Sequence, residues 1–259
     1  MLLASATLFV AAAAQRWWPA CPRGSFDSEE CLRLQDHQFD YLVPSDPWTP
    51  VGNAAQYAGV AMLLLAGAAA VLPFLLMRTH WSRVPIAVVV AAAVAVPGAQ
   101  TWASGVAGSA QPAWAGLAAG LVWGVGVPAL LIAWMVTRGR PDRPRTVWTT
   151  ALAGALIAST PVPAWLLGLM VAGYVSHDTA PWSEAGIAVP LVVAGVLVWK
   201  VSPRPRPEIA DAHARPAADP VEVGAGRRTE ARRRDELAEP CAARSRGGAI
   251  PLPWTVRDR

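Results

Sequence analysis

Four side chains have the types and the spacing for acid–base or metal chemistry: Asp36, His37, Asp40 and His177. Asp36 and Asp40 are four positions apart, so a helix would place both carboxylates on one face. A carboxylate and an imidazole can relay a proton or hold a divalent metal. The alternative is a solvated acidic helix face, and we favour it. We therefore expect no catalytic residue, no cofactor and no metal.

Two of the three cysteines, Cys21 and Cys31, lie ten positions apart ahead of the main apolar region. A disulfide between them is expected if this segment lies in an oxidising compartment. The alternative is a pair of free thiols, and a metal site would require two more ligands at suitable spacing. Cys241 lies alone, far along the chain.

Most of the chain is apolar, and its few charges are unevenly spread. Residues 1–199 contain nine acidic and nine basic residues, whereas the remaining 60 contain nine and thirteen. A helix needs roughly 20 apolar residues to cross about 30 Å of hydrocarbon, and helices satisfy their own backbone in lipid. The sequence therefore predicts an all-α, polytopic transmembrane bundle whose five spans are 54–77, 84–107, 114–137, 147–175 and 185–202.

A sixth apolar run, residues 1–14, is short for a span. It fits a signal peptide, because Ala12-Ala13-Ala14 resembles a small-residue cleavage site, although a positive segment before it is missing. It also fits a short first anchor helix. Both interpretations place the segment after it on the exported side.

Arginines alternate between the predicted loops. The loops 78–83 and 138–146 contain six arginines, and the tail begins with Lys200, Arg204 and Arg206, whereas 108–113 and 176–184 contain no basic residue except a histidine. Basic loops stay in the cytoplasm. We therefore expect a multi-pass protein of the cell membrane with a cytoplasmic C-terminus. Three arginines in the outer segment conflict with this rule: Arg16, Arg23 and Arg33.

Residues 15–53 are the most distinctive segment and are named the cap here. Asp27 and Glu30 have capping-box spacing, and we expect one amphipathic helix from Ser28 to about Leu42, ended by prolines. The bundle then covers 54–202. Residues 203–259 are rich in arginine, proline and acidic residues, and we expect a disordered tail. With 21 arginines and one lysine, the composition is typical of a GC-rich bacterial genome.

Gly116, Gly120 and Gly124 form a smooth stripe along the third predicted span. Such a stripe lets another helix backbone approach closely. The partner is either a helix of this chain or a second copy in a homo-oligomer. The fourth span contains Ser159-Thr160-Pro161-Val162-Pro163, which predicts a kink.

The spans are free of the buried ionisable groups that mark ion pathways. We therefore expect a non-enzymatic scaffold, assembly factor or sensor, with the lipid bilayer and a protein at the cap or tail as partners. One alternative is a transporter of a neutral or apolar solute that uses the Pro161–Pro163 break. A second is a membrane enzyme with its site at the outer surface. The pI of 9.4 comes from arginines at membrane edges and in the tail, so we expect no nucleic acid partner.

Overall fold

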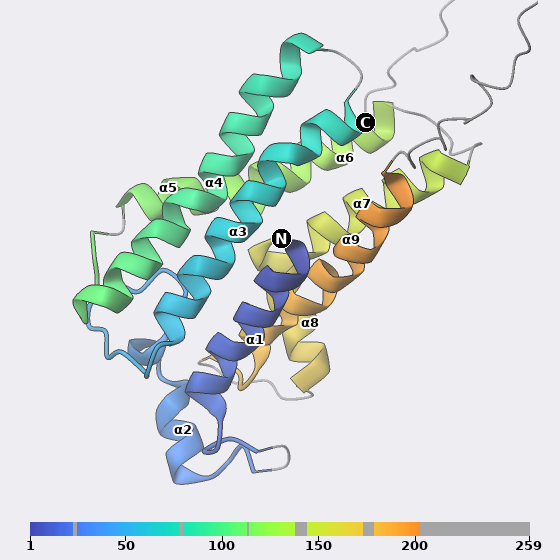
Figure 1. Ribbon diagram of the computed structural model, residues 1–259. Coiled ribbons are helices and arrows are strands. Elements are labelled where there is room, and N and C mark those ends of the chain that lie inside the picture. Colours follow the sequence, from blue (N-terminus) through green and yellow to red (C-terminus); the bar gives the residue numbers. More distant parts are fainter. Residues whose placement is uncertain (23–24, 78–79, 113, 138–143, 173–178, 203–259) are drawn as a thin grey trace, which may run out of the picture. The chain divides into compact units, whose positions relative to one another are not determined.

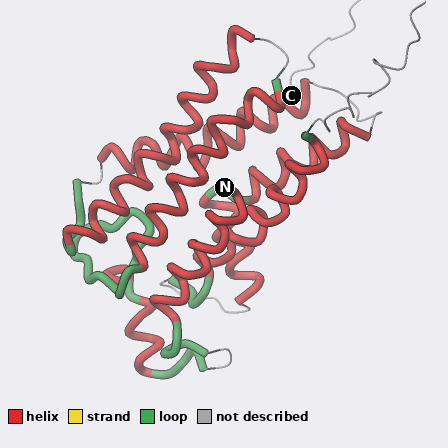
Figure 2. Tube along the Cα trace, viewed as in Figure 1, coloured by secondary structure: helices red, strands yellow, loops and turns green. Residues whose placement is uncertain are grey.

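A computed structural model describes residues 1–202, except for 23–24, 78–79, 113, 138–143 and 173–178. The described residues form helices and turns, and they contain no strand (Figure 2). The all-helical prediction is therefore confirmed for this part of the chain. The predicted disorder of 203–259 falls outside the described residues, as does Cys241.

The described helices follow the chain in this order: α1 (Leu2–Trp17), α2 (Glu29–Gln35), the 3₁₀ turn η1 (His37–Phe39), α3 (Ala54–Leu76), α4 (His80–Ala107), α5 (Trp114–Leu121), the π-helical turn η2 (Val122–Gly126), α6 (Val127–Thr137), α7 (Pro144–Ala158), α8 (Pro161–Ala172), the 3₁₀ turn η3 (Ser183–Ile187) and α9 (Ala188–Val201). Figure 1 shows α1 lying between α3 and α9. On one side α3 packs on α4, and α4 packs on α5; on the other side α9 packs on α7. The first and last long helices of the bundle are therefore direct neighbours.

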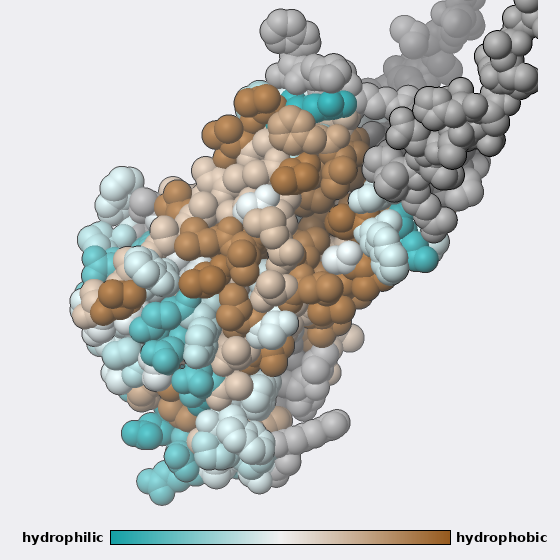
Figure 3. Space-filling model, in the orientation of Figure 1, coloured by the Kyte–Doolittle hydropathy of each residue, from teal (hydrophilic) through white to brown (hydrophobic). Residues whose placement is uncertain are grey.

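Four stretches are long and apolar enough to cross a membrane: Ala54–Leu76, Ser82–Ala107, Gly116–Thr137 and Ser183–Val201. They correspond to four of the five predicted spans. Figure 3 shows apolar side chains gathered along the helices and hydrophilic ones at the cap end. Large apolar side chains such as Val88, Val125 and Trp199 are exposed. An exposed apolar surface of this kind is typical of membrane association.

The fourth predicted span, 147–175, is not one continuous helix. It divides into α7 and α8 at Ser159–Thr160. Pro161 has no N–H to donate to the Ile157 carbonyl, so that acceptor needs another partner. The Thr160 backbone N–H and hydroxyl both donate to it, at 3.0 and 2.7 Å. The predicted break is thus a helix end followed by a new helix that begins with proline, where the missing N–H costs least.

Helix α1 is part of the bundle core. Leu2, Ala6 and Phe9 are buried together with residues of α3 and α9. The Ser5 hydroxyl donates to the Ala61 carbonyl at 2.8 Å, across the contact with α3. Ala12 and Ala13 are fully buried. The small residues that resembled a cleavage site therefore allow close packing in this structure.

The backbones of α3 and α4 approach each other closely at two glycines. A Cβ added at Gly59 would lie 2.6 Å from the Trp102 backbone nitrogen, and one at Gly98 would lie 2.8 Å from the Met62 Cβ. Within the predicted glycine stripe, a Cβ at Gly116 would collide with the Gln100 Oε1 of α4. Around Gly120 and Gly124 the space within 4 Å is open. Contact of the whole stripe with another helix remains a prediction.

A π-helical turn, η2, interrupts the third span between α5 and α6. The Val127 N–H donates to the Val122 carbonyl, five residues back. Pro128 follows directly, and its ring nitrogen has no N–H for the Gly124 carbonyl. Two glycines in the turn, Gly124 and Gly126, lower the helix propensity further. Turns of this type are frequent at functional sites, and this one positions Trp123, which is buried.

Candidate functional site

The cap contains a shorter helix than the sequence predicts. α2 ends at Gln35 rather than near Leu42, and its N-cap is Ser28, whose side chain accepts from the Cys31 N–H, rather than Asp27. Asp36 adopts an extended conformation, and its carboxylate accepts from the Gln38 N–H at 2.9 Å. An aspartate that caps the next turn competes with helix continuation. The chain therefore bends at Asp36 and points Asp40 inward.

Cys21 and Cys31 lie at disulfide distance, with their Cα atoms 5.0 Å apart. Both are fully buried in a small apolar cluster of the cap. This cluster also contains the buried side chains of Ala13, Trp17, Leu34 and Phe39. The predicted pairing therefore joins the end of α1 to α2 around a local core.

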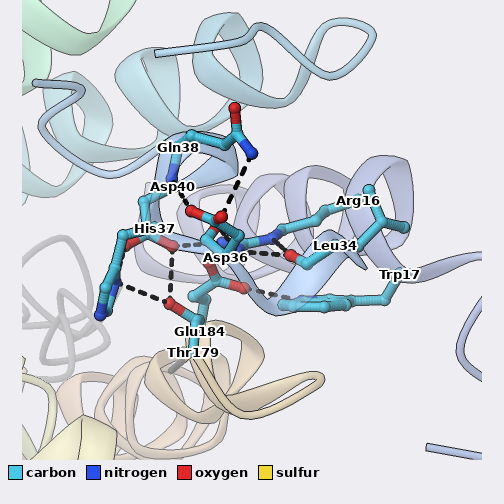
Figure 4. A network of polar contacts seen from close by, with 9 residues as sticks. All are labelled: Arg16, Trp17, Leu34, Asp36, His37, Gln38, Asp40, Thr179 and Glu184. Atoms are coloured by element: carbon cyan, nitrogen blue, oxygen red, sulfur yellow. Dashed lines mark hydrogen bonds and ion pairs between the residues drawn. The ribbon is translucent and has the colours of Figure 1, made fainter. Parts of the chain in front are cut away.

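Arg16, at the end of α1, is the centre of a buried polar network (Figure 4). Its side chain is 0% exposed. Its Nε and Nη2 donate to the Leu34 carbonyl at 2.9 and 2.7 Å, and Nη2 also donates to the Asp36 carbonyl at 3.2 Å. Its Nη1 donates to Asp40 Oδ1 at 2.6 Å and to Glu184 Oε1 at 2.7 Å. These five contacts match the five N–H donors of a guanidinium group.

Glu184, on η3, connects this network to the last predicted span. Its second carboxylate oxygen accepts from the Trp17 Nε1 at 2.7 Å. The Arg16 guanidinium lies over the Trp17 ring, 4.3 Å from its centroid. The two neighbouring residues of α1 therefore hold both oxygens of one carboxylate.

Tyr41 is buried beside this network. Its hydroxyl lies close to Glu184 but has no hydrogen bond of favourable geometry to a described residue. Burial raises the pKa of the Tyr41 phenol well above its ordinary value of 10.0, and the negative charge of Glu184 adds to this effect. Tyr41 therefore stays uncharged at any physiological pH.

Asp40 links the cap to the loop before η3. Its Oδ1 accepts from the Thr179 hydroxyl at 2.7 Å, and its Oδ2 lies 2.9 Å from His37 Nδ1. The Thr179 N–H donates to the Gln35 carbonyl at 3.0 Å. Of the predicted candidates, His37 and Asp40 are thus brought together, Asp36 serves as a local cap, and His177 lies outside the described residues. The described residues contain no group of three ligands suited to a metal.

A cavity of about 510 Å³, named the cap cavity here, extends from this network into the bundle. Its polar wall consists of His37, Asp40, Thr179, Ser183 and Glu184. Its remaining wall is formed mainly by apolar side chains and glycines of α3, α4, η2, α8 and especially α5, where Gly116, Leu117, Gly120 and Leu121 face it. The cavity therefore has a polar end at the cap and an apolar body within the bundle.

A second cavity of about 280 Å³, named the bundle cavity, lies among α3, α4, α6 and α7. Its wall is apolar apart from Thr137, Ser159 and Thr160. Trp123 lines both cavities. The break between α7 and α8 is also shared, since Thr160 lines the bundle cavity and Pro161 lines the cap cavity. Trp123 and this break therefore form the partition between the two cavities.

Several residues of the site were missed by sequence reasoning: Arg16, Trp17, Thr179, Ser183 and Glu184. One signal did point to Arg16, because it conflicts with the distribution of arginines between loops. A buried, fully paired arginine removes that conflict, since its position is set by its partners. Glu184 and Thr179 gave no such signal, as each lies more than 130 positions from its partner in the cap.

No family model matches the chain, and no curated protein or solved structure is significantly similar to it.

Proposed function

We propose that this chain is a non-enzymatic, multi-pass membrane protein that binds an amphiphilic molecule in the cap cavity. In this proposal the cap lies outside and the C-terminus in the cytoplasm, as the arginine distribution predicts. Helices α7 and α8 together form the fourth predicted span, and α1 is retained as part of the bundle. A sensor of a membrane component would have this form.

The observation that carries the proposal is the division of the cap cavity into a polar end and an apolar body. Binding sites for small molecules are mainly apolar, with a few polar groups that fix orientation. Five polar side chains meet at one end here, and helix side chains such as Met62, Leu117 and Trp123 line the rest. An amphiphile with its head at the cap and its chain in the bundle matches this distribution.

The experiment that tests this proposal fills the cap cavity with a side chain introduced at a glycine. A Cβ at Gly120 meets no atom within 4 Å, and Gly120 lines the cap cavity. Gly120→Leu should therefore occupy the cavity without displacing its neighbours. Gly124→Leu is the matched control, because Gly124 also has open space but is not among the residues that line either cavity.

The probe is a twelve-carbon alkanol with a mid-chain diazirine, photolysed with the full chain in nanodiscs. Adducts mapped by mass spectrometry should fall on Met62, Leu117 or Trp123. Gly120→Leu should reduce them several-fold, and Gly124→Leu should leave them unchanged. Adducts confined to exposed residues such as Val189 and Val196, equal in both variants, would overturn the proposal.

Transport of a neutral amphiphile is a second candidate, favoured by the two cavities that meet at Trp123. Movement of the partition would join them into one path along the bundle. In proteoliposomes, dithionite should then bleach inner-leaflet nitrobenzoxadiazole-labelled glucosylceramide over time. The Pro161→Ala, Pro163→Ala double variant should insert normally and slow this bleaching. Bleaching no faster than in protein-free liposomes would exclude transport of this probe and leave binding alone.

A further inference from the structure

The polar end of the cap cavity has an excess of negative charge. Two carboxylates, Asp40 and Glu184, lie in its wall, and the cation that pairs with both is Arg16. Arg16 itself is enclosed, and its five donors are matched by protein acceptors. It therefore offers no donor to a ligand. Among the described residues, and with His37 counted as neutral, one negative charge remains over at this end of the cavity.

Three groups of this wall, Asp40, Glu184 and Thr179, present acceptors rather than donors to the cavity. The Thr179 hydroxyl uses its hydrogen on Asp40, so its oxygen can only accept. Glu184 and Asp40 accept at every contact with Arg16, Trp17 and Thr179. His37 is the other titratable group in the wall and is largely exposed, with its Nδ1 beside Asp40.

Ser183 supplies an independent observation. It lines the cavity and is only 2% exposed, and its Oγ has no hydrogen-bond partner among the described residues. A buried hydroxyl without a partner costs free energy that a ligand can recover. Ser183 adjoins Glu184 in η3, so this residue belongs to the polar end.

We infer that the cap cavity selects an amphiphile whose head is a primary ammonium group, an inference that rests on the proposed binding function. Such a head supplies three N–H donors and one positive charge, which complement the acceptors and the negative excess. Attraction between opposite charges is strong where water is excluded. An anionic head would face Asp40 and Glu184 with Arg16 already occupied.

Four probes with the same twelve-carbon chain test this inference: dodecylamine, dodecyltrimethylammonium, dodecanol and dodecanoate. Their affinities for the full chain are measured by competition with the photoactivatable alkanol. Dodecylamine should bind about tenfold more tightly than dodecanol, which corresponds to about 1.4 kcal/mol, and dodecanoate should bind most weakly. Dodecyltrimethylammonium has the charge without N–H donors and should fall between the amine and the alkanol.

Two variants test whether the preference for dodecylamine arises at the polar end of the cavity. Asp40→Asn should remove most of the preference for the amine over the alkanol. Ser183→Ala leaves the Arg16 contacts intact and should weaken dodecylamine more than dodecanol, because a hydrogen bond to a charged group is the stronger one. The inference therefore does not depend on Asp40→Asn folding. Asp46→Asn, at an exposed carboxylate elsewhere in the cap, is the control.

The outcomes separate this inference from the proposed function. Equal binding of all four probes within the cavity would overturn the ammonium preference and leave amphiphile binding standing. A preference for dodecanoate would overturn it as well. Failure of every probe to compete would overturn the proposed function itself. Preference for dodecylamine unaffected by Ser183→Ala and Asp40→Asn would place the selectivity elsewhere and contradict the inference.

Discussion

Arg16 shows how a charge can be buried where the cap meets the bundle. Its guanidinium group has five donors, and the cap and η3 provide an acceptor for each. Lysine would keep the charge but offers only three donors on a compact ammonium group. We predict that Arg16→Lys lowers the free energy of unfolding by about 3 kcal/mol, within the range for breaking a buried ion pair. Thermal unfolding in detergent, followed by circular dichroism, measures this effect.

The matched control is Arg33→Lys, at an exposed arginine on α2. Its unfolding midpoint should stay close to that of the unchanged protein. Equal midpoints for the two variants would show that the Arg16 network contributes little to stability.

The raised pKa of Tyr41 predicts that the stability of the protein depends on pH in the alkaline range. The Tyr41 pKa is raised in the folded state, so above pH 10 the unfolded phenol loses its proton while the folded one keeps it. Stability should therefore be complete below about pH 10 and fall as the pH rises toward the folded-state pKa. Tyr41→Phe should flatten this decline, and Tyr57→Phe should retain it. Denaturant midpoints measured between pH 8 and 11 (a range centred near the ordinary phenol value) test the prediction, and parallel curves for the two variants would contradict it.

At the scale of elements, Gly59 sets how closely α3 approaches α4. A Cβ there would lie 2.6 Å from the Trp102 backbone nitrogen, whereas one at Gly120 meets open space. Gly59→Ala should therefore destabilise the protein by about 1–3 kcal/mol through overpacking. Gly120→Ala should be neutral or stabilising by about 0.5–1 kcal/mol, since alanine favours a helix. Thermal unfolding of both variants measures the difference, and a Gly59→Ala variant as stable as the unchanged protein would contradict this prediction.

The elements themselves were largely predictable, because a long apolar run such as 54–77 has one stable form in lipid. The break at Pro161 was predictable too, since proline removes a specific hydrogen bond. The polar end of the cavity was not, because it depends on contacts between distant segments, such as Arg16 with Glu184. The end of α2 was also missed: Asp36 and Asp40 have helical spacing, but Asp36 instead caps the following turn.

At the scale of the whole molecule, the proposed topology gives a labelling prediction. With Cys21 and Cys31 paired, Cys241 is the remaining thiol of the three. A membrane-impermeant maleimide should leave intact cells unlabelled and react with Cys241 after permeabilisation. Ser45→Cys places a thiol at an exposed position of the cap and should react in intact cells when Cys241 is replaced by serine. The reverse pattern would invert the topology.

Retention of α1 gives a second prediction at this scale. Cleavage after Ala14 would remove Phe9 and Ala12, which are fully buried against other helices. The purified protein should therefore retain the residues of α1, with or without Met1, when its intact mass is measured. A mass that corresponds to a chain beginning near Gln15 would contradict the proposal.

The pairing of Arg16 with Glu184 also has a consequence for synthesis. The two residues are 168 positions apart, so the ribosome exposes the arginine long before its second carboxylate. Asp40 arrives early, but the guanidinium cannot reach its final state until η3 and α9 are made. Until then one Nη1 contact of Arg16 lacks its carboxylate acceptor. The last segment of the bundle therefore completes a network that begins in the first, and a chain that ends before η3 cannot form it.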